Sequence, residues 1–389
     1  MRDEMRKIFF LTAARSEYDI LFPVIQAAAA SDALDSAIIV SAAHLSPFHG
    51  MGVEQIRKDG FEVAGCIESL LSSESWRGRA LSFAHLQEGL IHLLSIKRPD
   101  ILFVAGDREE ALAGALVANF LGIHVAHLHG GDRCIASELD EVFRPAISKL
   151  AHFHFTASAG HSERLVRMGE PEGQVWTTGG TGLDRLRTED DVSDEELNEE
   201  FGVDVRKPFF LLIQHPSPLM SSDDAGSEMT GILKGMLSLG YPVFCSYPNF
   251  DPGNMAIRVA IDKAKSEYDN LIVYHNLPRS RFVSLYRRCS AIVGNSSSIV
   301  IESGFLRVPG ILVGPRQNLR EIGENVLRVG VAENEVRDAC LRVLNDQEFL
   351  EKVRNCESIY GDGHAAPRIV KLLEEVKLDP ELLRKTITY

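Results

Sequence analysis

Three serines and a glutamate follow the apolar segment 291–294. They are Ser296, Ser297, Ser298 and Glu302. Serines that open a helix can cap it and leave backbone N–H groups free, so that a phosphate can bind at the positive helix end. Glu302 could then accept hydrogen bonds from both hydroxyls of a ribose. The segment predicts a nucleoside diphosphate site, and a serine-rich N-cap with a surface glutamate is the alternative.

Two arginines also follow expected strands. Arg316, next to Gln317, follows the apolar run 310–313, and its guanidinium could reach the same phosphates. Arg15 follows the first apolar run of the chain. Each arginine alone is more often a solvated surface cation. The serine segment, Arg316 and Arg15 all follow expected strands, and together they favour a binding site.

Asp107 and the segment around His127 and His129 indicate acid–base chemistry. Asp107 follows the apolar run 101–105, where catalytic groups of open α/β sheets stand, although it could also be only the N-cap of the next helix. His127 and His129 share one face of a strand before a Gly-Gly turn. We expect an acid–base or phosphate role for His129 and a core position for His127. No HExxH pattern is present, so a metal site is disfavoured.

Further titratable groups follow in both halves of the chain. Asp140 and Glu141 begin an expected helix, and paired carboxylates near Asp107 could supply an acid and a base. Two acids in a first turn are otherwise dipole partners. His215 ends the first expected strand of the second half, where it could donate a proton to a departing phosphate or be a loop residue.

Strand and helix patterns alternate along the chain, which predicts an α/β fold with two Rossmann-like doubly wound domains. The alternation restarts after a polar, acidic interval at 185–207, so a cleft is expected between the carboxyl ends of the two sets of strands. The expected strands are 8–11, 37–40, 101–105, 125–129, 153–156, 209–214, 243–246, 271–274, 291–294 and 310–313, and the clearest helices are 21–30, 80–96, 109–121 and 366–377.

Composition narrows the class of protein. The 389 residues include 41 Lys+Arg and 55 Asp+Glu, a net charge of −14, which argues against a general nucleic-acid surface. No signal peptide or membrane span is expected, and the six scattered cysteines suggest reduced thiols. We therefore expect a cytoplasmic protein that binds neither nucleic acid nor membrane.

Together, these segments resemble the hydrolysing UDP-N-acetylglucosamine 2-epimerases of sialic and legionaminic acid pathways. The resemblance is carried by residues 15–18, 106–108, 127–132, 140–141, 144 with 146–149, 215–216, 247–249, 294–297 with Glu302, and 316–317. It implies a GT-B type fold with domains at 1–183 and 184–358 and a tail, 359–389, that crosses back to the first domain. It also implies a homodimer or homotetramer and no cofactor.

The family resembled eliminates UDP from the sugar in the anti sense and then hydrates the glycal intermediate in the syn sense, giving N-acetylmannosamine from UDP-N-acetylglucosamine. By resemblance the catalytic groups are Asp107, His129, Asp140 and His215. The substrate-binding residues are Arg15, Arg108, Asp132, Glu141, Arg144, Asn249, Phe282, Ser296, Ser297, Ser298, Glu302, Arg316 and Gln317, with Glu302 at the ribose and Phe282 at the uracil.

The sequence departs from the family pattern near the expected sugar position. His129 stands where many relatives have glutamate, Pro145 replaces a common histidine, and Leu319 stands where glycine is usual. These differences predict an altered substrate preference. The alternatives are UDP- or GDP-linked 2,4-diacetamido-2,4,6-trideoxyglucose as substrate, a non-hydrolysing epimerase, a retaining glycosyltransferase and a catalytically silent sugar-nucleotide sensor.

Overall fold

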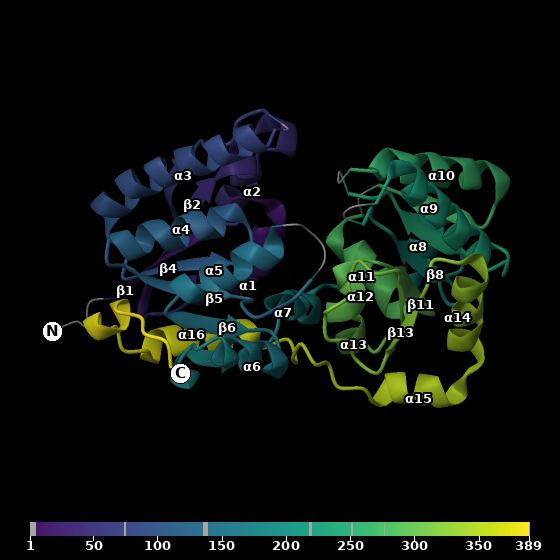
Figure 1. Ribbon diagram of the computed structural model, residues 1–389. Coiled ribbons are helices and arrows are strands. Elements are labelled where there is room, and N and C mark those ends of the chain that lie inside the picture. The colour runs from purple at the N-terminus through teal and green to yellow at the C-terminus, as the bar shows by residue number, and fades with distance from the viewer. Residues whose placement is uncertain are drawn as a thin grey trace. The chain divides into compact units, whose positions relative to one another are not determined.

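The computed structural model describes residues 5–73, 75–134, 139–217, 220–249, 252–275 and 277–388. The chain divides into two compact units (Figure 1). The described part of unit 1 comprises residues 5–73, 75–132, 139–185 and 361–388, and that of unit 2 comprises 133–134 and the described residues between 186 and 360. Each unit is a parallel sheet covered by helices, so the predicted pair of Rossmann-like folds is confirmed.

Unit 1 is built on a seven-stranded parallel sheet in the order β3-β2-β1-β4-β5-β6-β7. Most strands are buried on both faces, which explains their nearly continuous apolar sequences. The strands are β1 Arg6–Thr12, β2 Leu34–Ser41, β3 Val63–Ile67, β4 Ile101–Ala105, β5 His124–Leu128, β6 Phe153–Thr156 and β7 Val175–Thr177. The helices are α1 Arg15–Ala29, α2 Gly52–Lys58, α3 Trp76–Lys97, α4 Glu109–Phe120, α5 Asp140–Leu150 and α6 Ala159–Arg167, and α7 Thr181–Thr188 runs from unit 1 into unit 2.

Alternate residues of each strand enter separate cores on the two faces of this sheet. Ile8 and Phe10 of β1 join one core with α1, while Phe9 and Leu11 join the other with α3, α4 and α5. This is the two-residue period of a β-strand. The arrangement places the starts of α4 and α5 at the edge where β4 and β5 end.

The C-terminal segment belongs to unit 1. Helix α16, Ala365–Glu375, packs against α1 through Ile369 and Leu373, which are fully buried. Asp184 caps this helix, because its carboxylate accepts the backbone N–H groups of Ala365 at 2.9 Å and Ala366 at 2.7 Å. In Figure 1 the yellow α16 lies beside strands and helices from the first half of the chain.

Unit 2 repeats the same design with a six-stranded parallel sheet in the order β10-β9-β8-β11-β12-β13. Helices α9, α10, α14 and α15 share one core with alternate strand residues such as Phe210 and Leu212. The strands are β8 Phe210–Ile213, β9 Val243–Ser246, β10 Leu271–Tyr274, β11 Ala291–Gly294, β12 Gly310–Val313 and β13 Val326–Val329. The helices are α8 Asp194–Phe201, α9 Ser222–Leu237, α10 Asn254–Glu267, α11 Arg279–Arg288, α12 Ser297–Ile301, α13 Ser303–Leu306, α14 Glu333–Asn345 and α15 Gln347–Asn355.

Three further expectations concern the cysteines, membrane-spanning helices and clusters of metal ligands. All six cysteines are free thiols, and five are buried, as their scattered spacing suggested. Within the described ranges, no helix combines the length and apolarity needed to cross a bilayer. The described residues also contain no cluster of three or more potential metal ligands.

Candidate active site

Asp107 lies in the turn after β4, where a buried arginine from α5 holds its carboxylate. Gly106 takes a φ of 75° just before it. Arg144 donates from Nη2 to Asp107 Oδ2 and from Nη1 to the carbonyl of His129 at 3.3 Å. The Arg144 side chain is 5% exposed and that of Asp107 is 23% exposed. The arginine therefore fixes both the carboxylate and the backbone at His129.

The buried side chain of His127 supports the turn that carries Asp107. Its Nε2 lies 2.7 Å from the Gly106 carbonyl and its Nδ1 lies 3.1 Å from Ser148 Oγ. Burial lowers the pKa of His127 to about 3, so the ring is neutral at physiological pH. Because a carbonyl only accepts, Nε2 carries the proton and Nδ1 accepts from the serine. The prediction of a satisfied core histidine is confirmed.

β5 ends at Leu128, one residue earlier than the sequence suggested, so His129 lies in the turn that follows the strand. Its φ is 63°, a left-handed conformation that costs an L-residue roughly 1–2 kcal/mol. Strain of this kind concentrates at functional sites. Gly131 follows with a φ of 77°, and a Cβ there would lie 2.3 Å from the carbonyl oxygen of His161. This turn brings Asp132 Oδ1 to 3.3 Å from His161 Nε2, a contact that the sequence did not indicate.

Helix α5 supplies three of the predicted residues from its first two turns. Asp140 and Glu141 form the first turn and are half-buried, and Arg144 lies one turn beyond Asp140. Helical periodicity puts residues four apart on the same face. The side chain of Arg144 joins this helix to the end of β4 through Asp107. The structure thus brings together Asp107, Arg144 and the backbone of His129 at this edge of the sheet.

Arg108 occupies a position between two buried carboxylates. Its Nε lies 3.2 Å from Glu110 and 3.9 Å from Glu17. Glu17 also accepts the backbone N–H of Ala13 at 2.8 Å. Burial, helped by the nearby Glu110 charge, raises the pKa of Glu17 to about 8. Arg15, in contrast, is exposed at the start of α1.

In unit 2, serines open the short helix α12 directly after β11, as the sequence predicted. Gly294 has a φ of 123°, and a Cβ there would lie 2.1 Å from the carbonyl oxygen of Ile213, so glycine is required. Ser296 is the N-cap of α12, and its Oγ accepts from the N–H of Ser298 at 3.4 Å and from the Ser298 hydroxyl at 3.0 Å. Ser297 is the first residue of that helix.

Asn295 clamps His215 to this loop. Its Oδ1 accepts the His215 N–H at 2.8 Å, and its Nδ2 donates to the His215 carbonyl at 2.8 Å. The backbone N–H of Asn249 donates to His215 Nδ1 at 3.2 Å. Because Nδ1 accepts, the neutral ring carries its proton on Nε2. That tautomer is the one needed to donate a proton to a leaving group.

Glu302 ends α12 with a carboxylate that receives no hydrogen bond from the residues described in the structure. Its backbone N–H donates to the Ser298 carbonyl at 2.8 Å. Burial raises the pKa of Glu302, and only Arg279 opposes this shift. Phe282 is half-buried on α11 and its ring centroid lies 5.6 Å from that of Tyr286. Glu302 thus offers acceptor atoms to a ligand.

Arg316 and Gln317 both reach the Asn295 carbonyl, at 3.4 Å from Arg316 Nη1 and 2.9 Å from Gln317 Nε2. Gln317 is only 1% exposed and its Oε1 accepts from Arg320 at 3.0 Å, so it supports the loop from within. Leu319 has a φ of 77°, which explains why glycine is usual at this position. The sequence analysis assigned no role to His161, Asn295 or Glu17, although Asn295 and Glu17 stand inside the segments 294–297 and 15–18 that carry the resemblance.

The chain contains two Rossmann-like units. One holds a carboxylate after a central strand, and the other has a serine loop and a glutamate that receives no hydrogen bond from the described residues. Together these features define a GT-B type nucleotide-sugar enzyme. The family described as UDP-N-acetylglucosamine 2-epimerase matches residues 26–374. The chain belongs to this family and is a UDP-sugar 2-epimerase, and the resemblance to the hydrolysing members is confirmed.

The similar proteins include hydrolysing enzymes. The chain is 33% identical over 385 residues to the UDP-N,N'-diacetylbacillosamine 2-epimerase (hydrolyzing) of Legionella pneumophila, covering 99% of this chain and 100% of that one. It is 26% identical to the GDP/UDP-N,N'-diacetylbacillosamine 2-epimerase (hydrolyzing) of Campylobacter jejuni, covering 98% and 99%. The structure of UDP-GlcNAc 2-epimerase from Neisseria meningitidis bound to UDP-GlcNAc has a TM-score of 0.79 at 20% identity, covering 94% and 99%, and so shares the fold.

Proposed function

We propose that this protein is a hydrolysing 2-epimerase that releases UDP and a free, C2-inverted acetamido sugar from a UDP-linked 2-acetamido sugar. The observation that carries the proposal is the Asp107 carboxylate, partly exposed after β4 and held by the buried Arg144 beside His129. Its position suits a base that removes a carbon-bound proton, a contribution of ~10²–10⁴-fold in rate.

In the elimination step, Asp107 takes the proton from sugar carbon 2. The electrons of that C–H bond form the double bond between carbons 1 and 2, and the bond from carbon 1 to the phosphate oxygen breaks with its electrons on UDP. His215 donates the Nε2 proton to the departing phosphate, since its Nδ1 is occupied by the Asn249 N–H. The elimination therefore needs no redox cofactor.

In the hydration step, water adds across the double bond of the glycal. A proton goes to carbon 2 and the hydroxyl goes to carbon 1, on the same face, so that carbon 2 ends with the opposite configuration. His129 and Asp140, at the edge of unit 1 where β5 ends and α5 begins, are the proposed acid and base. Asp132, Glu141 and Arg15 are proposed to bind the sugar and phosphate groups.

The nucleotide is assigned to unit 2. We assign the ribose hydroxyls to Glu302, because this carboxylate has no donor within the described part of the chain. The phosphates are assigned to the hydroxyls of residues 296–298 and to the Arg316 guanidinium, and the uracil to Phe282. Preorganised donors of this kind stabilise the charge that develops on the leaving diphosphate.

Two substrates remain as candidates. The motifs favour UDP-N-acetylglucosamine, which would yield N-acetylmannosamine. The 33% identical relative, matched over its full length, is named for UDP-N,N'-diacetylbacillosamine, and this favours a 2,4-diacetamido-2,4,6-trideoxy sugar as the second candidate.

The test is incubation with each UDP-sugar, and with the GDP-linked diacetamido sugar, followed by chromatography of nucleotides and sugars. We expect equimolar release of UDP and free C2-inverted sugar from at least one substrate without any acceptor. Formation of a UDP-linked epimer with no free sugar would instead identify a non-hydrolysing epimerase. Turnover that needs an acceptor would identify a glycosyltransferase, and tight UDP binding without turnover would identify a sensor.

A further inference from the structure

The C-terminal end of helix α5 meets the last residues of the chain. The final carbonyl groups of a helix have no regular partner within it. Here Lys385 supplies a donor, because its Nζ bonds to the Ser148 carbonyl at 3.1 Å and also to the Ala151 carbonyl. A cation at this end interacts favourably with the helix dipole as well. The Lys385 ammonium therefore holds the C-terminal end of α5.

The segment that carries Lys385 is seated on unit 1 by contacts of its own. Leu378 and Leu382 pack against the apolar core that includes residues of α1 and α16. The Asp379 carbonyl lies 3.2 Å from Nε2 of His124, the first residue of β5. This segment follows residue 374, where the match to the family ends, and Figure 1 shows the C-terminus beside α6. Lys385 thus reaches α5 from a segment that is itself fixed.

A buried carboxylate, Glu170, receives the same ammonium group. Its Oε2 accepts from Lys385 and from His154 Nε2 at 3.0 Å, and its Oε1 lies 2.7 Å from Lys149 Nζ. Burial alone would raise the pKa of Glu170, but hydrogen bonds from these three donors lower it to about 2, so the group is ionised at physiological pH. If Lys385 were replaced, Lys149 and His154 would still pair with this carboxylate.

The helix that Lys385 holds is also the helix that reaches the turn of the proposed base. Arg144 of α5 donates to the Asp107 carboxylate. One turn later, the buried Ser148 hydroxyl donates to His127 Nδ1, and His127 Nε2 donates to the Gly106 carbonyl at 2.7 Å. Residues four apart lie on the same face of a helix. One face of α5 therefore supports Asp107 both directly and through the residue before it.

The turn after β5 packs against the same pair of side chains. A Cβ added to Gly130 would lie 3.0 Å from both His127 Nδ1 and Ser148 Oγ. Arg144 also holds the His129 carbonyl in this turn. Close packing of this kind transmits small displacements between neighbouring elements. A shift of α5 would therefore move the turns that carry Asp107 and His129.

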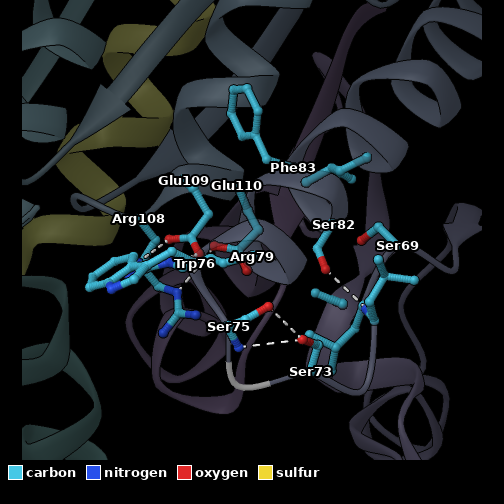
Figure 2. Close-up of a pocket in the computed structure, with 14 residues that line it drawn as sticks. Ser69, Ser73, Ser75, Trp76, Arg79, Ser82, Phe83, Arg108, Glu109 and Glu110 are labelled. Atoms are coloured by element: carbon cyan, nitrogen blue, oxygen red, sulfur yellow. Dashed lines mark hydrogen bonds and ion pairs between the residues drawn. The ribbon is translucent and has the colours of Figure 1, made fainter.

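The residues that follow Asp107 are anchored independently of α5. Figure 2 shows them at a pocket lined by the segment after β3, by α3 and by the first turn of α4. There Arg79 of α3 binds Glu109 of α4 through two hydrogen bonds of 2.6 and 2.7 Å. Bidentate pairs have a fixed geometry. Asp107 thus lies just before a fixed helix start, and the position of α5 decides how its carboxylate is oriented.

We infer that Lys385 is a positioning residue for the elimination step. By holding the end of α5, it keeps Arg144 and Ser148 where they orient Asp107 toward the proton on sugar carbon 2. This inference rests on the proposed function. Lys385 itself touches neither the substrate nor the reacting atoms and acts through α5. Because a displacement of about 1 Å at a catalytic group can cost about 10²-fold in rate, its loss should be visible in kcat.

The test compares the wild type, Lys385→Met and Lys371→Met on the UDP-sugar that the wild type turns over faster. Lys371 is exposed on α16, so its replacement is the matched control and should keep wild-type values. In Lys385→Met we expect kcat for UDP release to fall about 10- to 100-fold, while KM and UDP affinity change less than about threefold. Lys385→Arg, which keeps a cation with several donors, should lie closer to the wild type than Lys385→Met.

A second background separates positioning from general structural damage. In Asp107→Asn the carboxylate that Lys385 is proposed to orient is already absent. Adding Lys385→Met to this variant should therefore lower kcat by less than about twofold more. An equal fold-reduction by Lys385→Met in both backgrounds would show general damage and overturn the inference. Urea unfolding of each variant serves as the folding check.

The outcomes separate the inference from the proposed function. If the wild type releases UDP from no sugar nucleotide, the proposed function fails and the inference fails with it. If the wild type is active, Asp107→Asn is impaired and Lys385→Met keeps the wild-type rate, only the inference fails. Lys385→Gln keeps an N–H donor and is the milder variant if the methionine variant does not fold. Its kcat should fall about three- to tenfold, and an unchanged kcat would overturn the inference.

Discussion

Replacing Asp107 by asparagine removes the proposed base while keeping its size. The amide cannot accept a proton, so we expect the rate of UDP release to fall by about 10²–10⁴-fold, the usual contribution of a general base. UDP affinity should change less than about threefold, because the groups assigned to the nucleotide lie in unit 2.

The same substitution has a defined cost in stability. The Asp107 carboxylate accepts from Arg144, whose side chain is only 5% exposed. The asparagine oxygen can still accept this bond, and Arg144 keeps the His129 carbonyl at 3.3 Å. Asp107→Asn should therefore lower the unfolding free energy by about 1–3 kcal/mol, because a charge-assisted hydrogen bond becomes a neutral one. The cost should stay below that of leaving the buried Arg144 charge without any partner.

The assay combines three measurements on purified protein: coupled detection of UDP release, calorimetric titration with UDP, and urea unfolding. Asp190→Asn, the same chemical change at an exposed position, is the matched control and should retain wild-type values. Asp107→Asn with more than a tenth of the wild-type rate would refute the assignment of Asp107 as base. A parallel loss of rate and UDP affinity would show instead that the variant damages the nucleotide site.

Three further predictions concern other parts of the structure. Glu302→Ala should weaken UDP binding at least tenfold in calorimetric titration, about 1.4 kcal/mol, because it removes the proposed acceptor of the ribose hydroxyls, and unchanged affinity would contradict that role. Gly294→Ala should destabilise unit 2 by at least about 2 kcal/mol in urea unfolding, since its Cβ would lie 2.1 Å from the Ile213 carbonyl oxygen, and wild-type stability would show that the turn can relax. Glu17 has a pKa raised from 4.5 to about 8, so the native state holds a proton that the unfolded state has lost, and stability should fall by on the order of a few kcal/mol as pH rises from about 5 to 8 and level off above. Glu17→Gln should flatten this slope in urea unfolding at several pH values, and an unaltered slope would mean that another group carries it.

The strands that the sequence predicts best are those buried on both faces. The bounds of β4, β6, β9, β11 and β12 match the apolar runs. Those of β10 match as well, although β10 is half-buried and lies at the edge of its sheet. In contrast, β3, β7 and β13 lie at sheet edges and contain half-exposed residues, so their patterns are weak and were missed. The polar, acidic interval 185–207, for which no element was predicted, contains α8, because an acidic first turn stabilises a helix N-terminus.

The candidate site likewise contains residues that the sequence predicted and contacts that it could not predict. Asp107, His215 and the serine loop were found because functional groups follow strands in this fold class. Arg144 as the partner of Asp107, and Asn295 as the clamp on His215, depend on contacts between segments distant in sequence, which no local pattern encodes. The pocket lined by Ser69, Trp76 and Arg79 was not predicted, because β3, the strand that precedes Ser69, was missed.

The central claim is that carbon 2 loses its proton and is then protonated again as UDP is released. A proton NMR time course in deuterated water, with UDP-N-acetylglucosamine and the UDP-linked diacetamido sugar, observes this directly. The account predicts a free sugar with inverted configuration and solvent deuterium at carbon 2, formed together with UDP. A released sugar that keeps its original proton at carbon 2 would contradict it.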